Sequence, residues 1–302
     1  MTRSLSLRAR LFGPVSEFLL KPVLAAPADE LRPKLERIAG MITRMPGGTR
    51  VEAITLAGRA AEKLTPKGPI SAQTLYYMHG GAYLGGSPRT HRGMLAWIAK
   101  AAGCTVIALD YRLAPEHPYP AALDDAVAGW KALLAQGLKP EHLVIGGDSA
   151  GGNLALVTAI AIRDAGLPQP SGLVLLSPWT DLTSSGRSMG SRAERDRLLT
   201  VRGIDCAARA FAGSLPLNDP GLSPLFAELA GLPKTLIQVG DDELLLDDSV
   251  RYADAARQAG VDVTLDVKMQ LWHVWQVMAG WMPEADQAVA EIGVFLRGLR
   301  QP

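Results

Sequence analysis

Several features that would assign a protein quickly to a class are scarce in this sequence. Only two of its 302 residues are cysteine, Cys104 and Cys206, which is too few for a disulfide framework. Neither belongs to a CxxC pair, so we expect two reduced, buried thiols and no structural zinc site. An excess of one charge is also missing, because 31 Lys and Arg face 30 Asp and Glu. The net charge of +1 gives no reason to expect nucleic acid or an anionic membrane as the main partner.

Long apolar runs are absent as well. No stretch approaches the roughly 20 apolar residues of a membrane-spanning helix. Residues 1–28 combine basic residues with an apolar stretch, as an export signal does, but Glu17 and Lys21 interrupt the apolar part. We therefore interpret this segment as an amphipathic helix of the mature protein and expect a cytoplasmic location.

From residue 50 onward, short apolar runs alternate with segments of helical periodicity. This alternation predicts an α/β fold with a mainly parallel sheet covered by helices on both faces, and an antiparallel addition over 50–64 at one edge. The expected strands are 75–78, 105–109, 143–145, 173–176, 236–239 and 263–267. The expected helices include 92–102, 121–135, 153–165, 248–259 and 285–299.

Two helical segments do not fit the alternation: residues 1–45, and an Arg- and Ala-rich stretch at about 184–219. We expect both to pack together as a cap over one end of the sheet. The predicted organisation is therefore an N-terminal pair of cap helices (1–45) and a catalytic domain (46–302) that carries a cap insertion at about 184–219.

The clearest chemical signal is Gly147-Asp148-Ser149-Ala150-Gly151, a G-x-S-x-G pattern between an apolar strand and a helical segment. Small residues suit a sharp strand-to-helix turn that holds a nucleophile in a strained backbone conformation. A phosphate-binding loop is excluded, since neither GK[ST] nor GxGxxG occurs there. The pattern predicts Ser149 as a nucleophile.

A serine nucleophile needs a base and an acid. In hydrolases of this strand order the triad runs serine, acid, histidine, and His273 is the one histidine of five that follows Ser149. The acid is expected after the strand at 236–239, where Asp241, Asp242 and Glu243 are adjacent. Elementary chemistry does not choose among these three carboxylates.

A loop for the oxyanion follows the strand at 75–78. Residues 79–86 read HGGAYLGG, at the position where HGGG-type loops supply backbone N–H groups together with the residue after the nucleophile. Such donors stabilise the negative charge that develops on a carbonyl oxygen. The order of loop, nucleophile, acid and base predicts an acyl-transfer site.

Taken together, these motifs resemble the hormone-sensitive-lipase-like branch of the α/β-hydrolases, the bacterial family IV esterases. The resemblance extends over nearly all of the chain from about residue 70. It rests on YYMHGGAYLGGS (76–87), DYRLAPEHPYPAALDD (110–125), GGDSAGGNLAL (146–156), LLSPWTDLT (175–183) and LWHVWQ (271–276).

The resemblance implies an α/β-hydrolase fold and a cofactor-free serine carboxylesterase that acts on short- and medium-chain acyl esters. It implies oxyanion donors at Gly81, Ala82 and Ala150, with alanine in place of the commonest glycine at residue 82. Relatives carry D-P-L-x-D with a catalytic first Asp; without a gap, that position falls on Glu243, with Asp242 as the second choice. Family members also have a two-part cap, which matches the two outlying segments and would line the acyl pocket.

Other residues receive structural roles. We expect His79 to hold the oxyanion loop by hydrogen bonds, and Trp272 and Trp275 to fix the loop of His273 by packing. A structural polar network behind the site is expected from Asp110, Tyr111 and Arg112. No function is assigned to His91, His117 and His142.

Two other functions stay open at this point. The same triad would serve an amide, carbamate or lactone hydrolase, and a ligand-binding receptor on the same fold would need to have lost a triad member. The expected partner is a small-molecule ester. The chain is either a monomer or a homodimer formed through an edge strand near 263–267 or the final helix.

Overall fold

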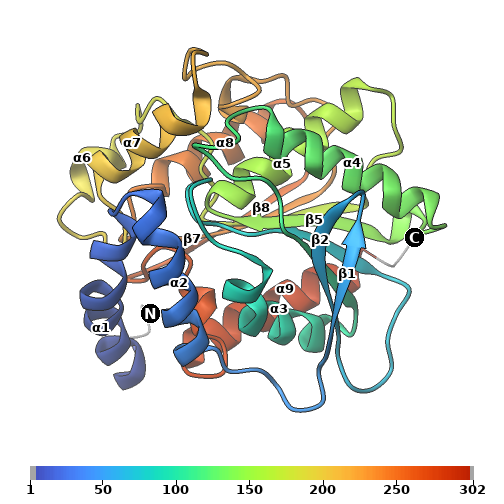
Figure 1. Ribbon diagram of the computed structural model, residues 1–302, viewed down its shortest axis with the longest axis horizontal. Helices are drawn as coiled ribbons and strands as arrows, with labels where there is room; N and C mark the ends of the chain where they lie inside the picture. The colour runs from blue at the N-terminus through green and yellow to red at the C-terminus, as the bar shows by residue number, and fades with distance from the viewer. Residues whose placement is uncertain (1–4, 300–302) are drawn as a thin grey trace.

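The computed structural model describes residues 5–299, so the outermost residues of the two expected domains, 1–4 and 300–302, lie outside the described part. An eight-stranded sheet forms the centre of the molecule, with the order β1-β2-β4-β3-β5-β6-β7-β8. Strands β4, β3, β5, β6, β7 and β8 are parallel neighbours, whereas β2 runs antiparallel to both β1 and β4. The predicted α/β architecture and the antiparallel edge addition are therefore confirmed (Figure 1).

The strands, in chain order, are β1 (Arg50–Leu56), β2 (Arg59–Thr65), β3 (Thr74–Met78), β4 (Thr105–Leu109), β5 (Leu143–Asp148), β6 (Gly172–Leu176), β7 (Thr235–Gly240) and β8 (Val263–Lys268). The helices are α1 (Leu7–Leu24), α2 (Ala28–Ile42), α3 (Pro88–Ala102), α4 (Ala121–Ala135), α5 (Ala150–Asp164), α6 (Ser188–Ser191), α7 (Val201–Ala212), α8 (Leu246–Gln258) and α9 (Pro283–Gly298). Short 3₁₀ turns lie at Pro140–His142, Pro224–Phe226 and Trp275–Met278.

Helices cover both faces of the sheet. One apolar core lies between the sheet and α4, α5 and α8, and a second lies between the sheet and the pair α3 and α9. Figure 1 shows these two helical layers on opposite sides of the strands. Strands β3, β5, β6 and β7 are buried along their whole length, which explains why their sequences are largely apolar and do not alternate with exposed polar residues.

Helix α3 begins four residues before the predicted start at Arg92 because of a local capping signal. Ser87 accepts a hydrogen bond from the backbone N–H of Thr90, while the Thr90 side chain accepts one from the backbone N–H of Ser87. Pro88 occupies the first helical position, where its missing N–H costs nothing. The apolar periodicity begins later than this cap, so the prediction from periodicity placed the start of the helix too late.

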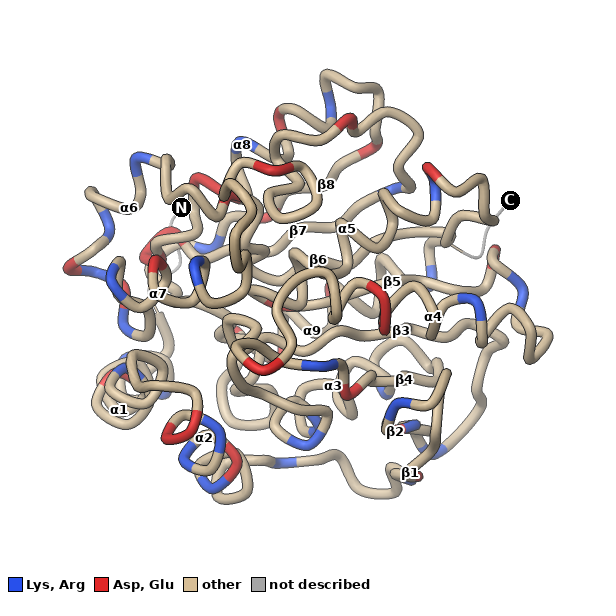
Figure 2. Tube along the Cα trace, turned by 45° about the horizontal axis from the view of Figure 1, so that its top comes forward, with Lys and Arg blue, Asp and Glu red and all other residues tan. Residues whose placement is uncertain are grey.

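The two outlying segments contain α1 and α2, and α6 and α7. Figures 1 and 2 place α1 and α2 beside each other, with α6 and α7 next to them at one end of the sheet. The Lys21 Nζ donates to the carbonyl of Asp196 at 2.6 Å, and Arg197 pairs with Glu17 at 3.0 Å. Within residues 5–299 no helix has both the length and the apolarity that crossing a bilayer requires.

Candidate active site

Ser149 lies at the turn between β5 and α5, with a left-handed φ of 53° and ψ of −121°. Residues other than glycine rarely adopt this backbone conformation. At Ser149 the strand before it and the helix after it hold the backbone in place. Glycine is required on both sides, because a Cβ at Gly147 would meet the backbone of Gly151, and a Cβ at Gly151 would meet the carbonyl of Met78. The G-x-S-x-G pattern thus reflects close backbone approaches, and Ser149 lines a cavity of about 790 Å³.

His273 and Glu243 meet beside this cavity. They come from the loops after β8 and β7, and the Nδ1 of His273 lies 2.6 Å from the Oε2 of Glu243. His273 is 4% exposed and lines the same cavity as Ser149, whereas Glu243 is fully buried. Ser149 and His273 thus share the lining of one cavity, while Glu243 holds the His273 ring from the protein interior.

The two neighbouring aspartates make different contacts. Asp242 pairs with Arg195 of the second outlying segment, and the carboxylate of Asp241 accepts the backbone N–H of Gln270. Neither carboxylate contacts His273 through a hydrogen bond within the described chain. Of the three carboxylates that the sequence left open, the structure brings Glu243 to the imidazole.

Two residues that the sequence analysis did not single out fix the acid. The hydroxyl of Ser177, directly after β6, donates to Glu243 Oε1 at 2.9 Å and accepts the N–H of Val274 at 3.2 Å. The buried carboxylate of Asp196 accepts the N–H of Leu244 at 2.7 Å, which ties the second outlying segment to the acid loop. The available sequence signals were the position of Ser177 at the carboxyl end of a buried strand and its place in LLSPWTDLT, a segment that carries the family resemblance.

The electrostatics suit a general base. Burial on its own disfavours the charged imidazolium, but the charge and hydrogen bond of Glu243, with the charges of Asp196 and Asp148, outweigh it. The pKa of His273 is therefore raised above its ordinary value of 6.5. A carboxylate on Nδ1 also fixes the tautomer that leaves Nε2 free to accept a proton.

The loop after β3 turns its backbone toward the cavity. Gly81 and Ala82 both have left-handed φ values, 124° and 56°, and both line the cavity. Ala150 is the first residue of α5, where a backbone N–H has no intrahelical acceptor. Within residues 5–299, none of the N–H groups of Gly81, Ala82 and Ala150 donates a hydrogen bond, so all three can serve a ligand.

Asp148, the residue before Ser149, anchors this loop to the nucleophile turn. Its Oδ1 accepts the N–H of Gly80 at 3.0 Å and the hydroxyl of Tyr77 at 2.9 Å, and its Oδ2 lies 3.1 Å from Nε2 of His91. Burial raises the pKa of Asp148, but His91 and Tyr77 lower it by more, so the net shift is downward. His91, to which the sequence assigned no function, therefore lies inside the site region and lines the cavity.

The other structural residues take several positions. Nδ1 of His79 lies 2.9 Å from the carbonyl of Gly80, its ring stacks on Tyr111, and burial lowers its pKa to about 3. The Tyr111 hydroxyl donates to the carbonyl of His79 at 2.5 Å. Asp110 and Arg112 belong to one polar network, because Arg59 donates to the carbonyl of Asp110 and both arginines pair with Asp125. Tyr111 contacts His79 instead.

The remaining aromatic, histidine and cysteine predictions have mixed outcomes. Trp272 and Trp275 are buried against Ala9 and Leu271 and do not line the cavity. His117 is exposed and His142 is half-buried. The expectation of two buried thiols is wrong for Cys206, which is exposed and lines the cavity, whereas Cys104 is buried.

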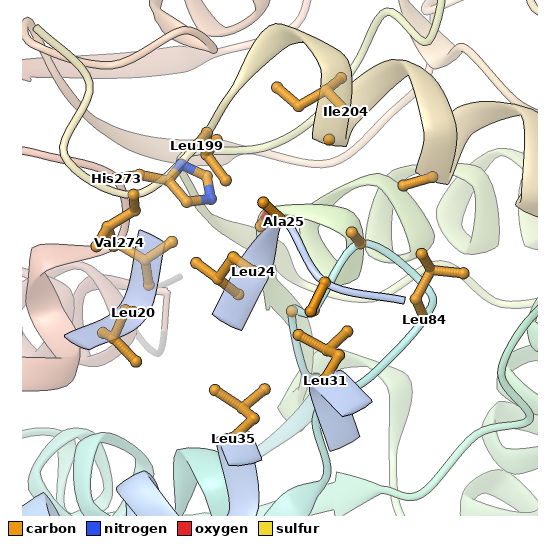
Figure 3. A pocket seen from close by; sticks show the side chains of 18 of the residues that line it. Leu20, Leu24, Ala25, Leu31, Leu35, Leu84, Leu199, Ile204, His273 and Val274 are labelled. Carbon is orange, nitrogen blue, oxygen red and sulfur yellow. The ribbon is translucent and has the colours of Figure 1, made fainter. Parts of the chain in front are cut away.

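The cavity has a volume of about 790 Å³ and a mainly aliphatic lining. Figure 3 shows Leu20, Leu24, Leu31 and Leu35 from α1 and α2 directed toward the same space as His273. Helix α7 and the residues before it contribute Leu199, Thr200, Ile204 and Ala207. Ser149 and His273 thus border an apolar chamber. No group of three or more metal-ligating side chains occurs in the described residues.

Comparison with known proteins agrees with this geometry. Residues 75–277 match the model of a family described as having the α/β-hydrolase fold. The chain is 38% identical over 291 residues to an esterase of Acinetobacter venetianus, covering 94% of this chain and 95% of the relative. It is 40% identical over 246 residues to an acetyl-hydrolase of Streptomyces hygroscopicus, covering 82% of each. A crystal structure of an esterase from the bacterial hormone-sensitive lipase family superposes with a TM-score of 0.92 at 39% identity, covering 100% of both chains.

Proposed function

Because this chain belongs to the α/β-hydrolase fold family, as a hormone-sensitive-lipase-like esterase, we propose that Ser149, His273 and Glu243 are its catalytic triad. The chain is a carboxylic ester hydrolase. The observation that carries the proposed triad is the 2.6 Å hydrogen bond between Nδ1 of His273 and Glu243, beside a cavity that Ser149 also lines.

The first half of the reaction acylates the serine. His273 Nε2 takes the proton of Ser149 as Oγ bonds to the ester carbonyl carbon, and the carbonyl oxygen becomes an oxyanion. The N–H groups of Gly81, Ala82 and Ala150 bind that oxyanion. When the tetrahedral intermediate collapses, the bond to the alkoxy group breaks, and His273 gives its proton to the departing alcohol.

The second half releases the acid. His273 takes a proton from water, whose oxygen bonds to the acyl carbon, and a second oxyanion occupies the same three N–H groups. Collapse returns the proton from His273 to Ser149 Oγ and frees the carboxylic acid. Throughout, Glu243 stays ionised and stabilises the imidazolium.

The proposed substrates are esters of short- to medium-chain acyl groups. Support comes from the cavity, whose aliphatic lining from α1, α2 and α7 suits a hydrocarbon chain. Its volume of about 790 Å³ limits the length of the acyl chain that can enter. Charged side chains are few along this lining. Apart from His91, Asp148 and His273 of the site, Arg202 is the charged residue that borders the cavity.

The test is hydrolysis of p-nitrophenyl acyl esters from acetate to palmitate by the wild type and by Ser149→Ala. We expect turnover that peaks at short or medium chains and a loss of kcat of about 10⁴-fold or more in the variant. Near-wild-type turnover by Ser149→Ala would refute the triad.

The acid is tested separately. We expect Glu243→Ala to lose about 10³- to 10⁴-fold in kcat, because the imidazolium loses its counter-charge. Asp242→Ala is the matched control and keeps near-wild-type kcat, since Asp242 pairs with Arg195 away from the imidazole. The reverse result would move the acid to Asp242.

A further inference from the structure

The outer face of α1 is unusually apolar for a solvent-exposed helix. Of the thirteen large apolar side chains that are exposed in the described chain, five lie on this one helix. Leu7 and Phe18 are each 81% exposed and Leu11 is 64% exposed. The full set on α1, which we call the α1 apolar face, is Leu7, Leu11, Val15, Phe18 and Leu19.

Helical periodicity makes this set a single stripe rather than scattered side chains. Residues 7, 11, 15, 18 and 19 follow the spacing of one helix face, while Ala9, Gly13 and Ser16 face the protein. From Leu7 to Phe18 the stripe is about 16 Å long. Because both sides of α1 are apolar or small, its sequence could not indicate which side is buried.

The apolar face continues into a groove beside the reaction cavity. Val15 and Leu19 border a groove of about 180 Å³ together with Met41 of α2, which is itself 67% exposed. Leu20 and Ile38 border this groove and also the 790 Å³ cavity of the active site. An acyl chain at the surface of α1 would therefore be separated from the cavity by a wall of side chains.

Charge on the first half of α1 is of one sign, whereas Glu17 of the second half pairs with Lys21 and Arg197. Arg8 and Arg10 are exposed, residues 5–16 contain no acidic residue, and Arg44 is exposed beside the end of α2. Within residues 5–299 the guanidinium of Arg10 has no hydrogen-bond or ion-pair partner. Although the net charge of the whole chain is only +1, residues 5–16 carry two arginines and no carboxylate, so this half of the helix is locally basic.

We propose that the α1 apolar face docks on an anionic lipid surface, with Phe18 and Leu11 inserted among acyl chains and Arg8 and Arg10 against the headgroups. Exposed apolar stripes with basic flanks are the physical signature of helices that lie in a lipid–water interface. Anionic headgroups complement Arg8 and Arg10, since residues 5–16 contain no carboxylate to neutralise them. A second copy of the chain is the alternative occupant, which the experiment below separates from a lipid surface. Docking would hold the cap segments, and the cavity beneath them, against a source of apolar esters.

The experiment is co-sedimentation of the whole protein with vesicles of phosphatidylcholine alone and of equimolar phosphatidylcholine and phosphatidylglycerol, at about 0.1 M salt. The wild type is expected to bind the anionic vesicles about tenfold more tightly or better. Leu11→Asp/Phe18→Asp should lose binding to both vesicles by about tenfold or more, and Arg8→Gln/Arg10→Gln should lose the preference for anionic vesicles. Val294→Asp on α9, which replaces a side chain that is 61% exposed elsewhere, is the matched control and should bind as the wild type does.

Hydrolysis of p-nitrophenyl acetate in solution monitors folding, and every variant is expected to keep wild-type kcat/KM because all four substituted positions on α1 are exposed. Absence of wild-type binding to either vesicle would overturn the proposal, as would equal loss of binding in Val294→Asp. Sedimentation velocity supplies the last outcome: a wild-type dimer that Leu11→Asp/Phe18→Asp converts to monomer, without vesicle binding, would assign the face to a second copy instead.

Discussion

Ile38 is the side chain through which chain-length preference can be changed most directly. It is 9% exposed and borders both the 790 Å³ reaction cavity and the 180 Å³ groove, as Leu20 and Ile42 also do. Ile38→Ala removes most of its side chain from the wall and is expected to join the two spaces. A longer acyl chain could then continue from the cavity into the groove.

The magnitude follows from apolar burial. Each additional methylene that enters the groove gains about 0.8 kcal/mol, or roughly a fourfold increase in kcat/KM. Two methylenes would raise the ratio of kcat/KM for p-nitrophenyl laurate over butyrate by about 15-fold. Because space already lies on both sides of Ile38, we expect a stability cost of about 2 kcal/mol, at the lower end for such truncations.

The assay compares kcat/KM for the butyrate, octanoate and laurate esters in wild type, Ile38→Ala and Leu35→Ala. Leu35 lies on the same helix and borders the cavity but not the groove, so its truncation enlarges the chamber without opening the wall. The laurate-to-butyrate ratio of Leu35→Ala should stay within about fourfold of the wild type. An unchanged ratio in Ile38→Ala, or an equal change in Leu35→Ala, would refute this account of the wall.

Three further predictions concern the site. Because only neutral His273 accepts a proton and its pKa is raised above 6.5, kcat/KM should fall as the pH falls through that raised pKa. Glu243→Gln should move this fall to lower pH in a pH–rate profile. An unchanged midpoint in the variant would contradict the claim that Glu243 raises the pKa of His273. Asp148→Ala leaves the Gly80 N–H, Tyr77 and His91 without their acceptor, so the free energy of unfolding measured in urea should fall by about 3–5 kcal/mol. A fall of under about 1 kcal/mol would contradict the role of Asp148 in anchoring the loop after β3. Ala82→Gly keeps the backbone N–H and relieves a φ of 56°, so kcat should stay within about threefold and stability should rise by up to about 1 kcal/mol, whereas a large fall in kcat would mean that the Ala82 side chain itself matters.

The sheet and most of its helices could be predicted from the sequence because buried parallel strands and covering helices have distinct periods. The expected strand at 143–145 proved to extend to Asp148, since Gly146 and Gly147 are buried but carry no apolar side chain to mark them. The prediction for Cys206 failed because it assumed that a lone thiol is buried. Residue 206 lies on the side of α7 that borders the open cavity, one turn after Arg202, and the sequence alone did not show that this side of the helix is exposed.

Contacts between distant residues set the other limit. The sequence placed Ser149 and His273 in order but could not choose between three adjacent carboxylates, which point in different directions within one loop. The contact of His91 with Asp148 spans 57 residues, and that of Ser177 with Glu243 spans 66, so no local pattern could reveal them. Only the family resemblance favoured Glu243 in advance.

The position of α1 has a consequence for how the chain is made. Ser6 hydrogen-bonds to Glu284 through both its N–H, at 2.7 Å, and its hydroxyl, at 2.9 Å, and Ala9 packs in a cluster with Trp272 and Ala285. During synthesis, α1 leaves the ribosome before residues 272–285 and must wait for them on the order of tens of seconds. In that interval the inner side of α1, which includes Ala9, lacks these native neighbours, so a helix from the start of the described chain completes its packing only after the final helix has been made.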